Sequence, residues 1–348
     1  MTIKQYKVAV LGATGAVGRE MLTVLDERRF PASEVIALAS TRSEGEEVLW
    51  GKRPLKVRVA TPEAFDGVDI VLASAGGTVS RELLPEAARR GCLCVDNSNA
   101  FRMFDTVPLV VPEVNPDDLL WHDGIVANPN CSTVQLVMAL QPLHQVAGLR
   151  RVVVSTYQSV SGAGQKGMDE LSAQTIALFN QKPFEVKVHN ARIAFNVIPH
   201  IGTFDAQGYT DEEMKLVYES RKIMGLPELR VTPTAVRVPV FGGHSESVLA
   251  EFERPLTPAQ ARELLAKMPG VSVVDDPKQR QYPMPIDAAE KDDVFVGRIR
   301  QDPTDLNALA FWVVADNLRK GAATNAVQIA LLAVERGLVR GAGRTAKA

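Results

Sequence analysis

The feature that most constrains the fold of this chain is a glycine-rich turn, GATGAVG, that directly follows its first apolar run. Residues 7–11 (KVAVL) form a short apolar run after its first lysine, without polar alternation, a pattern typical of a strand that is buried on both faces. Gly12, Gly15 and Gly18 then lead into a helical stretch. Such glycines allow a tight turn, let the backbone approach a pyrophosphate, and permit close packing of helix on strand. The turn therefore predicts a dinucleotide-binding loop; an ordinary glycine-rich turn is the alternative.

The apolar runs that follow alternate with helical stretches. Residues 35–39, 68–73 and 92–95 are predicted strands, and a helical stretch covers residues 80–91 between the last two. Strands that alternate with helices favour a doubly wound parallel sheet, in which ligands bind beyond the carboxyl ends of the strands. We therefore expect an α/β fold that opens with a Rossmann-like domain.

The pattern changes near Asn128. Beyond it, residues 151–160, 235–240 and 248–252 are rich in β-branched side chains and partly alternate with polar ones. These runs predict a mixed, largely antiparallel sheet with a few helices packed on it, one of them over residues 210–224. The sequence thus predicts a second domain of α+β type.

Composition excludes several classes of protein. Lys plus Arg total 39 and Asp plus Glu 41, which leaves a formal net charge of −2 and no basic surplus for nucleic acid. No apolar run reaches the ~18 residues of a membrane-spanning helix, and the first residues lack the pattern of a secretory signal. Three cysteines are too few for a disulfide scaffold, and no cluster of side chains has metal-ligand spacing. We expect a reduced, cytoplasmic protein without a metal, membrane or nucleic-acid partner.

The end of the second predicted strand indicates which dinucleotide is bound. An acid there would contact the ribose hydroxyls of NAD, whereas an arginine suits the 2′-phosphate of NADP. The residues here are Ser40, Thr41, Arg42 and Ser43, with no acid before Glu44. This pattern favours NADP; a solvated surface arginine is the alternative.

Cys131 is the candidate nucleophile. It lies in NPNCST, just before a run with apolar residues at helical spacing. A strand-to-helix turn would place its sulfur at a helix N-terminus, where the helix dipole and unpaired N–H groups favour the thiolate. Cys92 and Cys94, two apart within an apolar strand, are predicted to be buried hydrophobes. Taken alone, Cys131 is equally compatible with a structural role, so a group that activates it is needed.

Six motifs make the chain recognisable as a whole. GATGAVG, SNAFRM, NPNCST, YQSVSGAG, RVPVFGGHSES and DNLRKGAATNAVQIA occur in this order between about residues 4 and 334. The chain thereby resembles the aspartate-β-semialdehyde dehydrogenases, with NPNCST and GHSE as the most specific parts. The resemblance implies NADPH-dependent reductive dephosphorylation of L-aspartyl 4-phosphate to L-aspartate 4-semialdehyde through a cysteine thioester. It also implies a role in the biosynthesis of lysine (through diaminopimelate), threonine, methionine and isoleucine, and assembly as a homodimer or homotetramer.

The resemblance assigns catalytic roles to three residues. Cys131 would be the nucleophile, His244 the general acid and base, and Gln158 would orient the bound acyl group. A thiol suits this task because it is a strong nucleophile at neutral pH and a competent leaving group. An imidazole suits the proton transfers because it titrates near neutral pH. A hydrogen-bonded loop histidine is the alternative for His244.

The substrate carries three charged groups, and the resemblance assigns a contact to each. Arg237 would take the α-carboxylate, to which a guanidinium can offer two parallel hydrogen bonds. Arg102 and Lys215 would hold the phosphate, and Glu212 would meet the ammonium. Glu212 and Lys215 lie three apart on a predicted helix and so share a face; an exposed helical ion pair is the alternative.

The resemblance also implies the domain limits and the cofactor contacts. The NADP-binding domain would comprise residues 1–128 with a C-terminal helix over about residues 318–340, and the catalytic and dimerisation domain residues 129–317. The residues implied to contact NADP(H) come from both domains and are Gly12, Thr14, Gly15, Ala16, Val17, Arg42, Ser43, Ser161, Gly162 and Asn317.

Two other interpretations are open at this level. An acyl-phosphate reductase of the same architecture, such as an N-acetylglutamyl-phosphate reductase, acts on a substrate without a free ammonium, and Glu212 argues against it. A non-catalytic NADP-sensing protein could keep the fold. The presence of Cys131, Gln158, Arg237 and His244 argues against this second interpretation.

Overall fold

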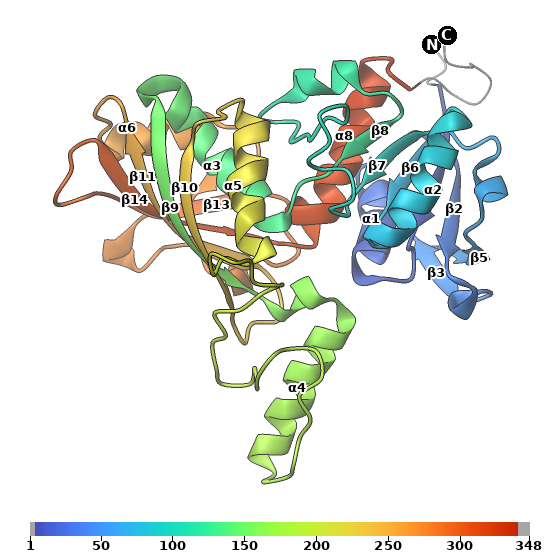
Figure 1. Cartoon of the computed structure of the whole chain (residues 1–348), viewed down its shortest axis with the longest axis horizontal. Coiled ribbons are helices and arrows are strands. Elements are labelled where there is room, and N and C mark those ends of the chain that lie inside the picture. Colours follow the sequence, from blue (N-terminus) through green and yellow to red (C-terminus); the bar gives the residue numbers. More distant parts are fainter. Residues whose placement is uncertain (1–3, 340–348) are drawn as a thin grey trace. The chain divides into compact units, whose positions relative to one another are not determined.

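The computed structural model of the chain describes residues 4–339, which divide into two compact units. The first unit runs to Pro129 and resumes at Ala322, and the second unit is Asn130–Gly321. Figure 1 labels most of the helices and strands of both units. Among the residues described, no helix is both long and apolar enough to cross a membrane.

The first unit is built on a parallel sheet. Its strands are β1 (Tyr6–Leu11), β2 (Ala32–Ala39), β5 (Arg58–Val59), β6 (Ile70–Ala73), β7 (Leu93–Asp96) and β8 (Ile125–Ala127), beside a small hairpin of β3 (Glu47–Trp50) and β4 (Arg53–Lys56). In the described residues the sheet order is β5-β2-β1-β6-β7-β8, and the strands pair in parallel throughout. This confirms the doubly wound α/β fold that the sequence predicts.

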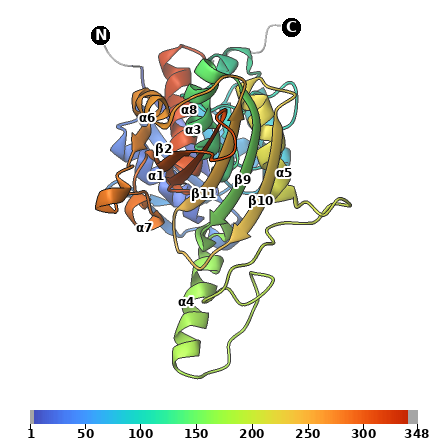
Figure 2. The ribbon, with the colours of Figure 1, turned by 90° about the vertical axis from the view of Figure 1, so that its left-hand side faces the viewer.

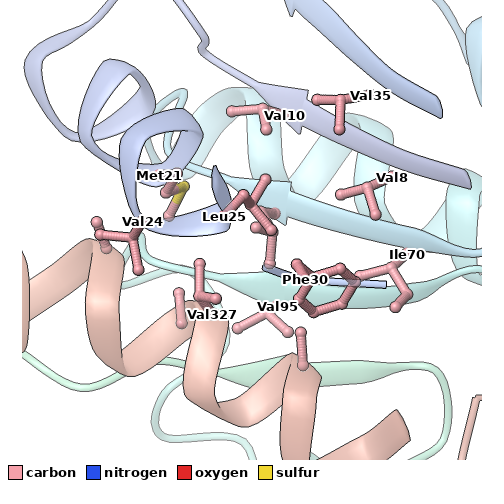
Figure 3. Packing of buried hydrophobic residues seen from close by; sticks show 14 of the residues in the cluster. Val8, Val10, Met21, Val24, Leu25, Phe30, Val35, Ile70, Val95 and Val327 are labelled. Carbon is pink, nitrogen blue, oxygen red and sulfur yellow. The ribbon is translucent and has the colours of Figure 1, made fainter. Parts of the chain in front are cut away.

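Helices pack on both faces of this sheet, which explains why its central strands are continuously apolar. They are α1 (Ala16–Glu27), α2 (Gly77–Arg89) and α8 (Thr324–Glu335). On one face, Leu25 of α1 and Val327 of α8 share a hydrophobic core with the strand residues Val8 and Val95 (Figure 3). On the other face, α2 packs against β7, where the thiol of Cys94 contacts the α2 backbone.

The glycine-rich turn lies where the order of the strands reverses. β1 has β2 on one side and β6 on the other, so the loops after β1 and β6 diverge at their carboxyl ends. Gly12 has a φ of +86°, and a Cβ there would lie 2.4 Å from the carbonyl oxygen of Ser74. A Cβ at Gly18, in α1, would lie 2.1 Å from the carbonyl oxygen of Gly12. Larger residues at these positions would displace the backbone that a pyrophosphate must approach.

The second unit is built on a mixed sheet (Figure 2). Its strands are β9 (Leu149–Gln158), β10 (Arg230–Arg237), β11 (His244–Phe252), β12 (Val271–Val273), β13 (Val294–Gln301) and β14 (Ala308–Ala315). Their order is β10-β9-β11-β14-β13-β12; β10 with β9 and β12 with β13 pair in parallel, and the central pairs are antiparallel. The predicted mixed, largely antiparallel sheet is confirmed.

Two helices of the second unit begin at residues that matter for its chemistry. Its helices are α3 (Cys131–Ala147), α4 (Gln165–Phe179), α5 (Asp211–Met224), α6 (Pro258–Lys267) and α7 (Pro285–Ala288). α3 begins at Cys131 because the side chain of Asn130 caps it, accepting from the N–H of Ser132 at 3.0 Å. α5 begins after Thr210, which forms a reciprocal capping box with Glu213. α3 and α5 pack against each other.

Two strands of the second unit end earlier than the sequence predicts. The run at residues 151–160 forms β9, which ends at Gln158 before a 3-10 turn. The run at residues 235–240 contributes only its first residues to β10, which ends at Arg237. Pro239 has no N–H to donate to a ladder, so the apolar run leaves the sheet at this point.

A wide turn precedes the C-terminal helix. The helix expected over about residues 318–340 is α8, which follows a π-helical turn at Arg319–Ala323; residue 340 lies outside the described residues. In this turn the N–H of Gly321 donates to the carbonyl of Asp316, five residues earlier, at 3.1 Å. Such turns widen a helix locally and are frequent at functional sites.

Candidate active site

The first unit has a cavity of about 550 Å³ beyond the carboxyl ends of its strands. Gly12, Thr14 and Gly15 of the glycine-rich turn line it, together with Arg42 after β2 and Ser74 after β6. Gly15 is also the N-cap residue of α1, so the first N–H groups of this helix lie beside the cavity. A helix N-terminus behind a close-packed glycine turn is suited to bind a pyrophosphate. The cavity therefore fits a dinucleotide.

The other residues predicted to contact the cofactor in this unit lie at the same end of the sheet. Arg42 is exposed in a 3-10 turn, Thr41–Ser43, directly after β2. The hydroxyl of Ser43 lies 3.4 Å from that of Thr14, which joins this turn to the glycine-rich turn. Ala16 and Val17 form the first turn of α1.

Arg102 is an ordered, buried residue of the first unit. Only 6% of its surface is exposed. Its Nε donates to the carbonyl oxygen of Asn128 at 2.9 Å, and its Nη2 donates to that of Asn97 at 2.9 Å. These bonds fix the plane of the guanidinium, as a phosphate-binding arginine requires.

Cys131 is the first residue of α3, so its thiol lies at the positive end of the helix dipole. The side chain is partly buried and forms no disulfide. The guanidinium of Arg237 is near enough to interact electrostatically with its sulfur. A helix N-terminus and a nearby cation both favour the thiolate. The second unit therefore contains groups that can activate this thiol.

Gly321 packs directly against Cys131. A Cβ at position 321 would lie 2.8 Å from the Cβ of Cys131 and 3.1 Å from its Cα. The backbone of the π-helical turn therefore occupies one side of Cys131, and it limits the positions that the sulfur can take.

Gln158 and Glu212 form a hydrogen-bonded network with the first turn of α3. Gln158, the last residue of β9, donates from Nε2 to the hydroxyl of Ser132 at 2.8 Å and to Glu212 Oε1 at 3.0 Å. The same oxygen of Glu212 accepts from Asn130 Nδ2 at 2.9 Å. Gln158 Oε1 is buried without a hydrogen-bond partner among the described residues. It is thus left to accept a hydrogen bond from a ligand.

Lys215 pairs with Glu212 one turn along α5, with Nζ 2.8 Å from Oε2. The two side chains are 22% and 13% exposed, so this is not the exposed helical ion pair that the sequence leaves open. Burial alone would raise the pKa of Glu212, but Lys215 and the hydrogen bonds from Gln158 and Asn130 lower it to about 2. Because this value is below the ordinary 4.5, the carboxylate stabilises the fold above that pH, and its contribution is lost as the pH falls toward 2.

Arg237 ends β10 beside Gln158, its register partner on β9. It is almost fully buried, and its Nη1 donates to the carbonyl oxygen of Ser159 at 2.6 Å. Burial lowers the pKa of Arg237, while the charges of Glu212 and Cys131 act in the opposite direction. A buried guanidinium beside a thiol is well suited to hold an anionic group of a ligand.

His244 begins β11 and is completely buried. Its Nδ1 lies 3.2 Å from the backbone nitrogen of Ser159 and 3.1 Å from the hydroxyl of the same residue. Its Nε2 is buried without a hydrogen-bond partner among the described residues, and a Cβ at Gly162 would lie 3.4 Å from it. Burial, together with the guanidinium of Arg237, lowers the pKa of His244 to about 3. The ring is therefore neutral at physiological pH.

The remaining predicted cofactor residues border this histidine. Ser161 lies with Gly162 in the 3-10 turn that follows β9. Asn317, after β14, accepts at Oδ1 from the hydroxyls of Ser159 at 3.0 Å and Ser161 at 3.1 Å, and from the N–H of Gly243 at 3.0 Å. Because this oxygen is fully engaged, only the Nδ2 of Asn317 is left for a cofactor.

The second unit brings most of the predicted catalytic and substrate residues together around the first turn of α3, and the sequence missed several that support them. Asn130 could have been found, since asparagine directly before a helix is a common cap. Glu219, whose carboxylate accepts from the N–H of Asn130 at 2.7 Å, could not. The supporting residues that the sequence missed are Asn130, Ser132, Ser159, Glu219 and Gly321.

The two other cysteines are buried in the first unit. The thiol of Cys92 donates to the carbonyl oxygen of Val68 at 3.1 Å, and burial raises its pKa to about 12. Burial raises the pKa of Cys94 well above its ordinary range. Neither is suited to act as a nucleophile. Within residues 4–339, no group of three or more His, Cys, Asp or Glu side chains could hold a metal ion.

A dinucleotide-binding parallel sheet followed by a mixed-sheet unit with a thiol at a helix N-terminus defines a class of oxidoreductase, the semialdehyde dehydrogenases. Residues 7–122 match the family described as "semialdehyde dehydrogenase, NAD binding domain". Residues 140–320 match the family described as "semialdehyde dehydrogenase, dimerisation domain".

The chain belongs to the aspartate-semialdehyde dehydrogenase family, whose members are enzymes of amino-acid biosynthesis. It is 52% identical to the aspartate-semialdehyde dehydrogenase of Aquifex aeolicus, over 96% of this chain and 99% of that protein. The crystal structure of aspartate semialdehyde dehydrogenase II from Vibrio cholerae complexed with ASA matches with a TM-score of 0.93 and 46% identity, over 95% and 99% of the two chains. Aspartate semialdehyde dehydrogenase with NADP from Candida albicans matches with a TM-score of 0.76 and 25% identity, over 97% and 100%. The family predicted from the motifs is confirmed.

Proposed function

We propose that the chain catalyses NADPH-dependent reductive dephosphorylation of L-aspartyl 4-phosphate to L-aspartate 4-semialdehyde, through a thioester on Cys131. The reaction would serve the biosynthesis of lysine, threonine, methionine and isoleucine. The observation that carries this proposal is the grouping of Cys131, at the start of α3, with two charged side chains: Glu212, which bonds the preceding Asn130, and the buried Arg237, which lies beside Gln158. A thiolate flanked by one cation and one anion is complementary to an amino acid that carries an activated acyl group.

The acyl-transfer step follows from the position of Cys131. Its thiolate would attack the acyl carbon and expel phosphate, which leaves a thioester. NADPH, when bound, supplies the hydride that reduces the thioester. Gln158 would orient the acyl group. His244 would act as the general acid and base through its Nε2, which has no hydrogen-bond partner among the described residues.

Each charged group of the substrate would have a partner in the chain. Arg237 would hold the α-carboxylate, and its order and burial reduce the entropy lost on binding. Glu212, with a pKa of about 2, is ionised at neutral pH and so able to pair with an ammonium. Arg102 and Lys215 would hold the phosphate, one through a planar fork and the other as a point charge.

The cofactor contacts would follow the cavity of the first unit. Gly12, Thr14, Gly15, Ala16 and Val17 would hold the pyrophosphate, and Arg42 with Ser43 would hold the 2′-phosphate. Ser161, Gly162 and Asn317 would contact the cofactor from the second unit. The match to a family member solved with NADP supports this choice of cofactor.

Arg42→Glu is expected to weaken the binding of NADP(H) much more than the binding of NAD(H). The variant loses a charge-assisted hydrogen bond to the 2′-phosphate, and its carboxylate repels that group while suiting the ribose hydroxyls of NAD. Affinity for NADP should fall by about tenfold to a hundredfold in equilibrium titrations. Arg89→Glu, the same charge change in the last turn of α2, is the matched control. An unchanged ratio of NADP to NAD affinity in Arg42→Glu would contradict the assignment.

Gly321→Ala is expected to disturb the nucleophile. The added methyl group would overlap the Cβ and Cα of Cys131, which cannot rotate away, so the first turn of α3 must shift. We expect slower alkylation of Cys131 by iodoacetamide and a turnover lower by about tenfold to a hundredfold. NADP affinity, measured in parallel, should not change. A variant with normal alkylation and normal turnover would show that this contact is unimportant.

The direct test of the proposed function is the reverse reaction. Aspartate semialdehyde, NADP and phosphate or arsenate should give NADPH, followed by its absorbance. Turnover of N-acetylglutamate semialdehyde in place of aspartate semialdehyde would favour the acetylglutamyl-phosphate reductase instead. Cofactor binding without turnover of either aldehyde would favour a non-catalytic protein.

The oligomeric state is a separate part of the proposal. The match to a dimerisation domain over residues 140–320 supports an oligomer. We expect a homodimer, with a homotetramer as the alternative. The molar mass of the full chain in solution, measured by light scattering, distinguishes the two.

A further inference from the structure

We propose that Asn128 and Asn325 are positioning residues for phosphate binding, because their side chains hold in place the backbone carbonyls that orient the guanidinium of Arg102. Both asparagines are completely buried, so they act through Arg102 and not on the phosphate itself. All of these residues belong to the first unit. The inference rests on the proposed function for the identity of the anion, whereas the hydrogen bonds around Arg102 belong to the chain itself.

Two backbone carbonyls set the orientation of Arg102. Its Nε donates to the carbonyl oxygen of Asn128 and its Nη2 donates to that of Asn97, each at 2.9 Å. Asn97 directly follows β7, and Asn128 directly follows the neighbouring parallel strand β8. Because both donors belong to one rigid plane, the spacing of the two carbonyls determines the direction of the guanidinium. A carbonyl does this without neutralising the positive charge.

The side chains of three asparagines link the residues that supply these carbonyls to α8. Asn128 Nδ2 donates to Asn97 Oδ1 at 2.7 Å, and Asn128 Oδ1 accepts from Asn325 Nδ2, also at 2.7 Å. Asn128 Nδ2 also donates to the carbonyl oxygen of Ala322 at 3.3 Å. Asn325 Nδ2 also donates to that of Val110 at 3.0 Å. Because a carbonyl can only accept, it fixes which end of each amide faces it, and hence the direction of every bond in this asparagine chain.

Asn325 is a polar residue in an apolar part of its helix. It lies in the first turn of α8, 197 positions from Asn128. The residues that follow it, Ala326, Val327, Ile329 and Ala330, belong to the hydrophobic core of the first unit. A buried amide in such surroundings is costly unless it is hydrogen-bonded, and no water competes for its bonds. An apolar side chain would serve the packing, so the amide indicates a role for the bonds.

Loss of the Asn325 amide would reach Arg102 through Asn128. The buried Oδ1 of Asn128 would lose its donor, so the side chain must turn or the residue must shift. The carbonyl oxygen of the same residue accepts from Arg102 Nε, which would then lose its fixed acceptor. A guanidinium that is free to move loses more entropy when it binds an anion. The affinity for phosphate should therefore fall.

Asn325→Ala is expected to raise the KM for inorganic phosphate in the reverse reaction by about threefold to tenfold, the effect of one lost hydrogen bond. Arsenate presents the same tetrahedral arrangement of oxygens, so its KM should rise by the same factor. The kcat at saturating phosphate and the KM for aspartate semialdehyde should change by less than about twofold. A merely structural role would reduce the fraction of active protein, which lowers kcat and leaves the KM for phosphate unchanged.

Gln328→Ala is the matched control. Gln328 lies three residues further along α8 and donates from Nε2 to Glu113 at 2.8 Å, so this variant also removes a side-chain bond of the helix. That bond is separate from the asparagine chain, and we expect a wild-type KM for phosphate. NADP affinity should be unchanged in both variants, which shows that each is folded. An equal rise of the KM for phosphate in Gln328→Ala would overturn the proposal.

The orientation of Arg102 can also be observed without turnover. In ¹H–¹⁵N spectra of the full chain, the Hε of a buried, hydrogen-bonded arginine exchanges slowly with water. Arg102→Lys assigns the signal by its disappearance. We expect slow exchange in the wild type and in Gln328→Ala, and exchange faster by about tenfold or more in Asn325→Ala. Exchange in the wild type at the rate of free arginine would overturn the proposal, even if Asn325→Ala failed to fold.

The two measurements separate this inference from the proposed function. Faster exchange in Asn325→Ala with an unchanged KM for phosphate would overturn the claim that the asparagines serve phosphate binding. A raised KM without faster exchange would show that Asn325 does not act through Arg102. The expected exchange rates in a chain that does not turn over aspartate semialdehyde would refute the proposed function and leave the positioning of Arg102 standing.

Discussion

Cys131→Ser is expected to abolish turnover, with kcat lower by about 10⁴-fold or more, while NADP still binds with wild-type affinity. A serine hydroxyl ionises far less readily than a thiol, so the start of α3 and the charge of Arg237 cannot convert it into a nucleophile. Phosphate-dependent NADPH formation measures the loss, and titration of the cofactor measures the binding.

The three cysteines of the chain provide the control for this experiment. Burial raises the pKa of Cys92 to about 12 and that of Cys94 well above its ordinary range, so brief treatment of the native protein with iodoacetamide should label Cys131 selectively. Cys92→Ala should be labelled and inactivated like the wild type. Loss of activity and cofactor affinity to the same degree in Cys131→Ser would point to a structural cysteine.

The parallel sheet could be predicted because its central strands are buried on both faces. β1 and β6 have no polar face, and the glycines after β1 mark the point where the strand order reverses. The sequence predicted that the second sheet is mixed, but it did not predict where the strands β9 and β10 end. The sequence shows an apolar run through Val240, and only the missing N–H of Pro239 marks where the run leaves the sheet.

Some residues of the candidate site could be predicted from the sequence, and others could not. Residues that carry the chemistry, such as Cys131 and His244, stand in motifs that can be recognised, and their assigned roles stay predictions. Residues that support them depend on contacts between distant parts of the chain. Asn317 meets Ser159 across 158 positions, and Gly321 meets Cys131 only through the π-helical turn. A single sequence does not show which distant residue a given glycine or serine will contact.

Arg237→Leu is expected to lower kcat/KM for aspartate semialdehyde by about 30-fold to several thousandfold. Removing one member of a buried, hydrogen-bonded charge pair costs about 2–5 kcal/mol, and each 1.4 kcal/mol is about tenfold. The guanidinium is buried and bonded to Ser159, so no other conformation of the loop replaces it cheaply. Arg230→Leu, at the exposed start of the same strand, is the matched control and should keep wild-type kinetics.

A substrate without the carboxylate decides whether Arg237 binds that group. 3-Aminopropanal keeps the aldehyde and the ammonium of aspartate semialdehyde and lacks only its α-carboxylate. If Arg237 holds the carboxylate, the wild type should have a low kcat/KM for this analogue. Arg237→Leu should then lower kcat/KM for the analogue only slightly. If Arg237 instead mainly orders the loop of Ser159 or stabilises the thiolate of Cys131, the variant should lose as much with the analogue as with the substrate. One change removes the guanidinium of Arg237 and the other removes the carboxylate of the substrate. Comparing their combined effect on kcat/KM with the two separate effects therefore distinguishes recognition of the substrate from organisation of the site.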